Sequence, residues 1–290
     1  MEHESAAVDK RLLRRAFERA AAGYDAAAVL QHEVCRRMLA RLDYVKLAPA
    51  AILDAGCGTG NVIAALRARY PGAALYALDI APGMVRRACT RMSWWSRARG
   101  RGVVPVCGDI ERLPLRTGCA NMVWSNLALQ WVNEPPRAFA ELRRVLAPGG
   151  LLMFSTFGPD TLKELRAAYR GTDRYTHVNQ FIDMHDLGDM LGHAGFAGPV
   201  MDMEYITLTY ADVRALMRDL KAIGAHNVTS GRPPGMTARA ILAAVERNYA
   251  VFVRDGRLPA TFEVIYGHAW VPQPRLNADG RPIIPIRSKN

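Results

Sequence analysis

The sequence predicts an α/β fold in which a doubly wound, mostly parallel sheet carries helices on both faces. Between residues 50 and 157, short apolar runs alternate with stretches of helical periodicity, which is the pattern of parallel strands joined by crossover helices. A glycine cluster follows the first of these runs, as in folds that bind a ligand at the carboxyl edge of such a sheet. Half of the 290 residues are apolar, which is enough to bury a full core.

Helices are expected before the sheet. Apolar residues recur at helical spacing from Leu12 to Ala20 and again from Leu30 to Leu42. The small-residue segment AAAGYDAAA separates the two patterns and carries Tyr24. We therefore expect residues 1–48 to form a helical N-terminal cap.

The remaining elements follow from the same two periodicities. Buried strands are expected at 51–53, 75–78, 103–107, 122–125 and 151–157. Helical spacing covers 62–66, 83–92, 136–147, 160–169, 185–194, 211–225 and 237–254. Extended segments near 200–209 and 261–271 are expected to complete the sheet. The main domain then spans 49–272 with a helical insertion at about 158–258, and 273–290 form a basic flexible tail.

Composition excludes several classes of protein. No apolar run approaches the ~18–20 residues of a membrane helix, and charges occupy the place of a signal peptide's apolar core. Neither a disulfide framework nor a zinc site is expected, because the cysteines are odd in number and none has C-x-x-C spacing. These are Cys35, Cys57, Cys89, Cys107 and Cys119. We expect a cytoplasmic protein with free thiols, no metal and no membrane association.

The net charge is +11, from 38 basic and 27 acidic residues. Between Asp79 and Asp109 the chain has no acidic residue. The arginines of this stretch are Arg86, Arg87, Arg91, Arg97, Arg99 and Arg101. Such a run is typical either of a surface that docks an anionic partner or of an ordinary solvated face. The sequence leaves both interpretations open.

The strongest chemical signal is the segment DAGCGTG at 54–60, between an apolar strand and a helix. Glycines at this point let a ligand approach the backbone closely. The third glycine comes only two residues after the second, which departs from the G-x-G-x-x-G of dinucleotide folds, and the G-K-[ST] of a phosphate loop is absent. Cys57 has no evident base beside it, so we interpret it as a small packing residue.

This D-x-G-x-G-x-G segment resembles the first motif of class I S-adenosylmethionine-dependent methyltransferases, which have a Rossmann-like, seven-stranded sheet. Asp79, at the end of the next strand, matches the family's acidic residue for the ribose hydroxyls. The segment 107–110, CGDI, resembles the motif that contacts adenine. Three such motifs in order favour S-adenosylmethionine as the cofactor. The resemblance implies a cofactor site made of Asp54, Gly56, Gly58, Gly60, Asp79, Ile80, Met84, Asp109, Ile110, Asn126, Leu127 and Gln130.

Later segments are narrower in family range. The stretches 123–131, 154–165, 177–181 and 216–227, together with Phe17, Tyr24 and Asp25, resemble the malonyl-acyl carrier protein O-methyltransferases of biotin synthesis. The resemblance runs from about residue 11 to 272. It implies methyl transfer to the free carboxylate of a malonyl thioester carried by acyl carrier protein. Acyl carrier proteins are acidic, so the resemblance gives the basic excess a partner. No nucleic acid is expected as a partner.

A malonyl carboxylate is already ionised at pH 7, so the site needs cations and hydroxyl donors rather than a general base. Arg214, Arg218 and Lys221 share one stripe of their expected helix. We take Arg218 and Lys221 as the candidates that hold the carboxylate, and the resemblance places Tyr24 over the active site. The expected catalytic set is Tyr24, Arg218 and Lys221, and the expected substrate site adds His226, Asn227 and Arg232.

Other functions stay open at this point. The acceptor is alternatively another acid or a quinone-like ring. A related mitochondrial assembly factor of complex I that hydroxylates a protein arginine shares the core and the M-R-D-L helix at 217–220, so similarity alone does not separate the two reactions. A non-enzymatic assembly protein that binds the cofactor is a further alternative. The segment NLAL at 126–129 argues against nucleic-acid modification, since base-modifying families carry N/D-P-P-Y/F there.

Overall fold

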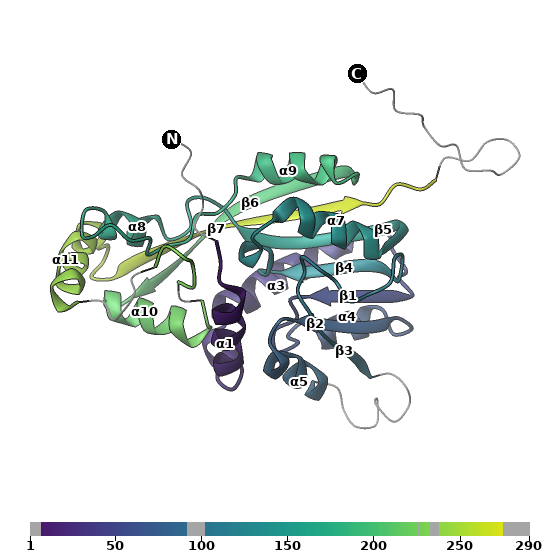
Figure 1. The fold of residues 1–290 in the computed structure, drawn as a ribbon, viewed down its shortest axis with the longest axis horizontal. Coiled ribbons are helices and arrows are strands. Elements are labelled where there is room, and N and C mark those ends of the chain that lie inside the picture. The colour runs from purple at the N-terminus through teal and green to yellow at the C-terminus, as the bar shows by residue number, and fades with distance from the viewer. Residues whose placement is uncertain (1–6, 92–101, 226, 233–237, 275–290) are drawn as a thin grey trace, which may run out of the picture.

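The computed structural model describes residues 7–91, 102–225, 227–232 and 238–274 (Figure 1). In this part of the chain a seven-stranded sheet has the order β3-β2-β1-β4-β5-β7-β6. Strands β1 to β5 pair in parallel with one another, whereas β7 runs antiparallel to both β5 and β6. The expected α/β architecture with a mostly parallel sheet is therefore confirmed.

Each expected helix and strand has a counterpart. The strands are β1 (Ala51–Ala55), β2 (Ala74–Asp79), β3 (Val103–Cys107), β4 (Ala120–Asn126), β5 (Leu146–Phe157), β6 (Ala197–Tyr210) and β7 (Leu258–Trp270). The helices are α1 (Lys10–Ala20), α2 (Tyr24–Ala27), α3 (Val29–Arg41), α4 (Ile63–Arg69), α5 (Pro82–Thr90), α7 (Pro135–Val145), α8 (Lys163–Tyr169), α9 (Met184–His193), α10 (Val213–Ala222) and α11 (Arg239–Tyr249). Short 3-10 turns are η1 (Leu42–Tyr44), η2 (Leu129–Trp131) and η3 (Ala250–Phe252).

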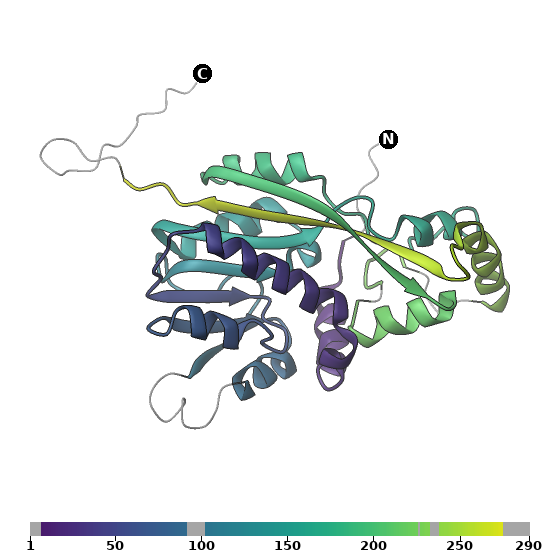
Figure 2. The same cartoon turned by 180° about the vertical axis from the view of Figure 1, so that it is seen from behind.

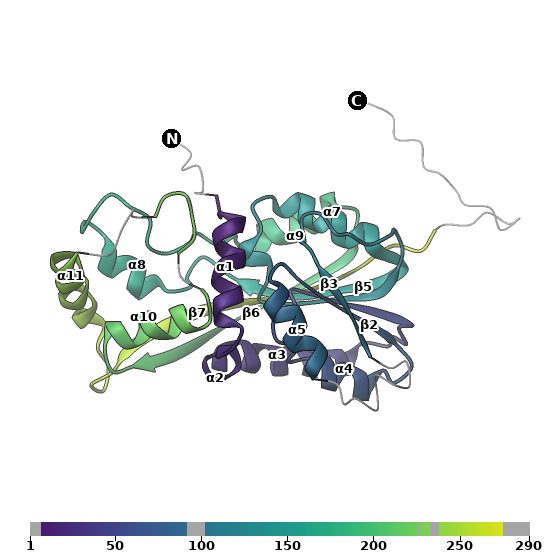
Figure 3. The same ribbon diagram turned by 60° about the horizontal axis from the view of Figure 1, so that its bottom comes forward.

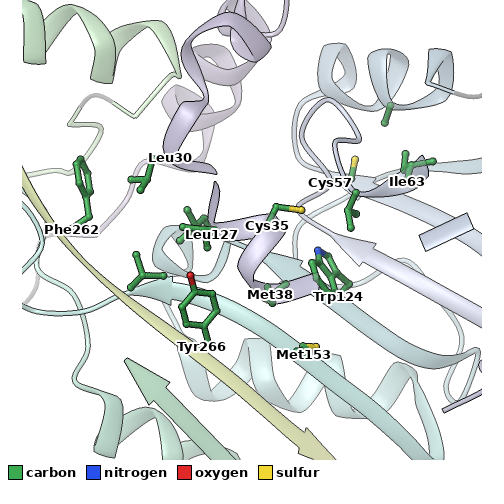
Figure 4. Packing of buried hydrophobic residues seen from close by; sticks show 14 of the residues in the cluster. Leu30, Cys35, Met38, Cys57, Ile63, Trp124, Leu127, Met153, Phe262 and Tyr266 are labelled. Atoms are coloured by element: carbon green, nitrogen blue, oxygen red, sulfur yellow. The ribbon is translucent and has the colours of Figure 1, made fainter. Parts of the chain in front are cut away.

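The central strands send alternate side chains to the two faces of the sheet. Ile52 and Trp124 pack in one cluster with the apolar faces of α3 and α4. Leu53 and Val123, one position along each strand, pack in a second cluster with α7 and α9. Figure 4 shows Trp124 beside Met38 of α3, and both are fully buried. Trp124 therefore belongs to the core.

Strands β6 and β7 extend beyond the parallel core and support a group of helices (Figure 2). Their outer ends pair up to Tyr210 and Leu258, and α8, α10 and α11 pack against these ends and one another. We call α8, α10 and α11 the cap. The segment 158–258, expected as a helical insertion, also contains β6 and α9, which belong to the core side of the molecule.

Helix α1 lies between the core and the cap (Figure 3). Asp9 caps its N-terminus by accepting hydrogen bonds from the amides of Arg11 (2.9 Å) and Leu12 (3.1 Å). The end of α10 meets the middle of α1, because a Cβ at Gly224 would lie 3.1 Å from Phe17 Cδ1. Helix α1 also contacts α5 of the core, so it joins the two halves.

Some sequence features lie outside the described residues. These are Arg97, Arg99, Arg101, His226 and the tail from residue 275 onward. No helix in the described ranges combines the length and the apolar character that crossing a bilayer requires.

Candidate active site

The glycine loop leaves β1 and is fastened to the end of β2. The amides of Gly56 and Cys57 donate to the Leu78 carbonyl (2.8 and 2.9 Å), and the amide of Gly58 donates to Asp79 Oδ2 (3.0 Å). Gly58 has φ +50°, and a Cβ there would meet only Tyr24 Cε1, at 3.9 Å. The loop thus presents bare backbone to the space beside Tyr24.

Gly56 and Gly60 allow close packing behind the loop. Both have positive φ, at +83° and +81°. A Cβ at Gly56 would lie 2.3 Å from the Cβ of Ala128, and one at Gly60 would lie 2.8 Å from the backbone of Ala88 in α5. These two glycines fix the shape of the loop, whereas Gly58 opens it to a ligand.

A cavity of about 80 Å³ lies at the carboxyl edge of the sheet, beside this loop. We call it the glycine-loop cavity. The expected cofactor residues that line it are Gly56, Gly58, Asp79, Ile80, Met84, Asp109, Ile110, Asn126 and Leu127. A hollow of about 40 Å³ on the other side of the loop contains Asp54, together with Gly56 and Gly58. Motifs from three separate strands therefore meet around one loop.

Two of the expected cofactor residues lie elsewhere. Gly60 is not among the described residues that line a cavity, because it packs against Ala88. Gln130 lines the larger cavity under the cap instead. Its amide nitrogen donates to the Leu127 carbonyl (2.7 Å), and its amide oxygen is buried with no partner among the described residues.

The carboxylates of the glycine-loop region are buried and strongly perturbed. Burial raises the pKa of Asp54 to about 8, with the nearby charge of Asp79 adding to the effect. Burial also raises the pKa of Asp79, to about 6, although the amides of Ala81 and Gly58 stabilise its charged form. Asp54 Oδ2 has no hydrogen-bond partner among the described residues. Both acids therefore present acceptors whose charge a bound ligand's donors would stabilise.

Asp109 and Asn126 are partly engaged with protein groups. Asp109 Oδ1 accepts from Lys10 Nζ of α1 (3.1 Å). The Asn126 amide nitrogen donates to the Gln31 carbonyl (3.1 Å), and its oxygen accepts from the Ser155 hydroxyl (2.9 Å). These bonds fix the α1 and α3 helices against the carboxyl edge of the sheet.

A second cavity, of about 550 Å³, lies between α1, α2, α8 and α10. We call it the cap cavity. Its wall is largely apolar, and the residues it shares with the glycine-loop cavity are Phe17, Tyr24, Leu127 and Trp131. Leu127 and Leu162, which both border it, have positive φ values of +48° and +56°. Leucine rarely adopts this conformation, and such backbone strain concentrates at functional sites.

Tyr24 stands where the hollows meet, since it borders the cap cavity, the glycine-loop cavity and the hollow at Asp54. Burial raises its pKa, and the charges of Asp79 and Asp25 raise it further. Asp25, the next residue, accepts from the Thr59 hydroxyl (2.5 Å) and pairs with Arg91 (2.5 Å), which ties α2 to the glycine loop and α5. The phenol therefore remains protonated and serves as a hydrogen-bond donor.

The cap cavity contains some of the expected substrate residues. Lys221, Asn227 and Arg232 line it. The Asn227 amide donates to the Thr176 carbonyl and accepts from Thr229, so it organises the loop. Arg218 is exposed and is not among the described lining residues, although it shares a helical stripe with Lys221. The physical reason is that the C-terminal end of α10 meets α1, and Lys221 lies almost one turn closer to that contact.

Several residues of the cap cavity were not expected from the sequence. Arg19 of α1, Gln31 of α3 and His177 line it. Trp131 borders both cavities and packs edge-on against Phe17, with ring centroids 5.6 Å apart. Local sequence patterns do not predict that Arg19 or Gln31 lines a cavity, because tertiary packing determines which faces of α1 and α3 border it. His177 lies within a stretch that resembles the family, which was the available signal.

His177 is held on both sides. Its ring stacks on Tyr169 with centroids 3.8 Å apart, and its Nε2 lies 2.9 Å from each oxygen of Asp173.

Among the described residues no group of three His, Cys, Asp or Glu side chains could hold a metal ion. Burial raises the pKa of Cys57, so its thiol stays neutral and behaves as a packing group.

The arginine run after Asp79 is partly neutralised where it is described. Arg86 pairs with Glu18 (2.6 Å) and Arg91 pairs with Asp25 (2.5 Å). Arg87 is exposed. The role of this run as a docking surface stays a prediction.

Comparisons with known proteins agree with this geometry. A family model described as a methyltransferase domain matches residues 53–154. A SAM-dependent methyltransferase of Thermotoga maritima has the same fold, with a TM-score of 0.50, 16% identity, and coverage of 89% of this chain and 99% of that one. Two curated relatives are named malonyl-[acyl-carrier protein] O-methyltransferase. That of Gallionella capsiferriformans is 59% identical over 96% of both chains, and that of Xylella fastidiosa is 43% identical over 96% of both. The chain therefore belongs to the malonyl-[acyl-carrier protein] O-methyltransferase family.

Proposed function

We propose that this protein transfers a methyl group from S-adenosylmethionine to the free carboxylate of a malonyl thioester on acyl carrier protein, as a step of biotin synthesis. The observation that carries the proposal is the sequence identity of 57–59% to four relatives of that name, over 93–96% of this chain. The geometry supports it, because the cavity at the glycine loop, with the carboxylates of Asp79 and Asp109 in its wall, shares Tyr24 with the larger cap cavity.

The residues at the glycine loop fit the cofactor. Gly58 leaves room for a ligand against the backbone, and Asp79 offers a carboxylate where the sheet ends. The buried, unpartnered oxygen of Asp54 suits a donor with positive charge, such as an ammonium group. Ile80, Met84 and Ile110 give the cavity apolar walls. When bound there, S-adenosylmethionine supplies an electrophilic methyl group on a sulfonium.

The chain's own part in catalysis is alignment and the exclusion of water. The nucleophile is an ionised carboxylate, so no residue has to remove a proton from it. Phe17, Leu127 and Trp131 form apolar walls where the two cavities meet. Removing water from a carboxylate strengthens the interactions that orient it. Tyr24 places a neutral phenol at this junction, which can orient one oxygen without neutralising the nucleophile.

Recognition of the carboxylate is assigned to the cations of the cap cavity. Arg19, Lys221 and Arg232 line it. Asp219 is the one carboxylate among its described lining residues, and it accepts from the Tyr210 hydroxyl (2.7 Å). The cavity is therefore biased toward an anionic substrate end, while its apolar wall suits the thioester and its arm.

The test is direct. Purified protein is incubated with S-adenosylmethionine and malonyl-carrier protein, and the carrier is weighed intact by mass spectrometry. We expect a gain of one methyl group that disappears when acetyl-carrier protein replaces the malonyl form. An unchanged carrier mass, with cofactor binding still measurable, would contradict the proposal and favour the alternative of an arginine hydroxylase or an assembly factor.

A further inference from the structure

Unpaired arginines gather on the exposed face of α1. Arg11, Arg15 and Arg19 are spaced at i, i+4 and i+8, so they form one stripe along the helix. All three are exposed. None forms an ion pair with a residue that the structure describes. Their charges are therefore available to a partner.

The stripe continues onto α10. Arg218 and Lys221 are exposed there and likewise have no ion pair within the described residues. Helices α1 and α10 lie side by side (Figures 1 and 3) and touch where Gly224 meets Phe17. Arg19 and Lys221 also line the cap cavity. We call Arg11, Arg15, Arg19, Arg218 and Lys221 the basic collar, because they lie on the two helices, α1 and α10, that border that cavity.

Nearby acidic groups do not neutralise the collar. Glu18, on the same helix, accepts from the Gly83 amide (2.6 Å) and pairs with Arg86. Asp9 caps α1, and Asp219 of α10 accepts from Tyr210. By contrast, Arg214, which also lies on α10, pairs with Glu246 (2.8 Å). The positive charge is thus concentrated where the cap cavity begins.

We propose that the basic collar is the docking surface for the acidic face of the acyl carrier protein, which brings the carrier-borne thioester arm to the cap cavity. The inference rests on the proposed function and names where its protein substrate binds. It follows from charge complementarity and from the position of the collar beside the cavity. It also gives the exposed Arg218 a role in holding the carrier, in place of direct contact with the malonyl carboxylate.

The test compares two substrates in the double variant Arg11→Glu/Arg15→Glu, whose altered residues do not line the cap cavity. We expect KM for malonyl-carrier protein to rise about tenfold at low salt, because reversing charges at an interface weakens steered encounter. The difference should shrink as salt is raised toward 1 M, where screening acts over about 3 Å. Turnover of malonyl-pantetheine, which has no carrier surface, should stay within about twofold and also reports an intact fold.

Two matched controls locate the effect. Arg247→Glu reverses one exposed charge on α11, and Arg87→Glu reverses one exposed charge in the competing arginine run, which is half of the charge change in the double variant. Both should leave KM for the carrier unchanged. An unchanged KM in the double variant, or an equal rise of KM in either control, would contradict docking of the carrier at the basic collar. If the wild-type protein methylated neither malonyl-carrier protein nor malonyl-pantetheine, the proposed function itself would be overturned.

Discussion

The glycine-loop cavity and the cap cavity differ in how the chain builds them. The first is made mainly by residues that directly follow β1, β2, β3 and β4, and backbone bonds fasten it to the sheet. The second is made by side chains from α1, α2, α8, α10 and the loop around residue 227. The cofactor end is thus encoded locally, whereas the substrate end depends on how distant helices pack. Changes at the first should affect every substrate, and changes at the second should discriminate between substrates.

The largest effect is expected at Gly60. Alanine there would hold φ +81° and bring its Cβ 2.8 Å from the Ala88 backbone, so we expect Gly60→Ala to lower the free energy of unfolding by about 2–4 kcal/mol. Thermal unfolding would measure the loss. Gly58→Ala is the matched control, because it shares the positive φ, at +50°, but its Cβ would meet only Tyr24 Cε1, at 3.9 Å. It should keep most of the stability while weakening cofactor binding at least tenfold by calorimetry. Equal unfolding temperatures for the two variants would contradict this division of roles.

At the junction of the two cavities, Tyr24→Phe keeps the ring and removes the hydroxyl donor. We expect kcat to fall by about 10–100-fold, because an oriented donor at the reacting group is lost. The melting temperature and the affinity for the cofactor should hardly change. Single-turnover methylation of malonyl-carrier protein would measure the effect. A loss of cofactor affinity as large as the loss in kcat would show that the hydroxyl of Tyr24 binds the cofactor and does not orient the substrate carboxylate.

Inside the cap cavity, Lys221 can be compared with its neighbour Arg218. Lys221→Met removes a cation that lines the cavity, so we expect KM to rise about tenfold for both malonyl-carrier protein and malonyl-pantetheine. Arg218→Met should raise KM about two- to threefold for the carrier alone, because Arg218 lies outside the cavity. Cofactor affinity should be unaffected in both. If Arg218→Met impaired the small thioester as much as Lys221→Met, the expectation of direct carboxylate recognition by Arg218 would be restored.

This contrast also explains what could be predicted from the sequence. Gly56, Gly58, Asp79 and Asp109 lie at the end of a strand or within three residues after it, so their place at the sheet edge was predictable from a parallel topology. The seven-stranded sheet was predictable for the same reason, since its apolar runs are local. The roles of Arg218 and Arg19 were not, because helical periodicity shows which residues share a stripe but not which cavity the stripe faces. That facing depends on the contact between α10 and α1 at Gly224.

The pH dependence of stability should also set the cofactor end apart from the cap cavity. Because the pKa of Asp54 is raised to about 8 in the fold, its protonated form is favoured there, so its contribution to stability is full below about pH 4 and is lost as pH rises through about 8. Asp54→Asn imitates the protonated form at every pH. We expect the cofactor-free variant to melt several degrees above the wild type at pH 9 and close to it at pH 4.

Added cofactor should reverse that order, since the wild type alone keeps the charged acceptor for it. If the melting temperatures of the wild type and the variant differed by the same amount at pH 4 and at pH 9, the Asp54 carboxylate would be charged at both. Its burial would then not destabilise the fold as pH rises.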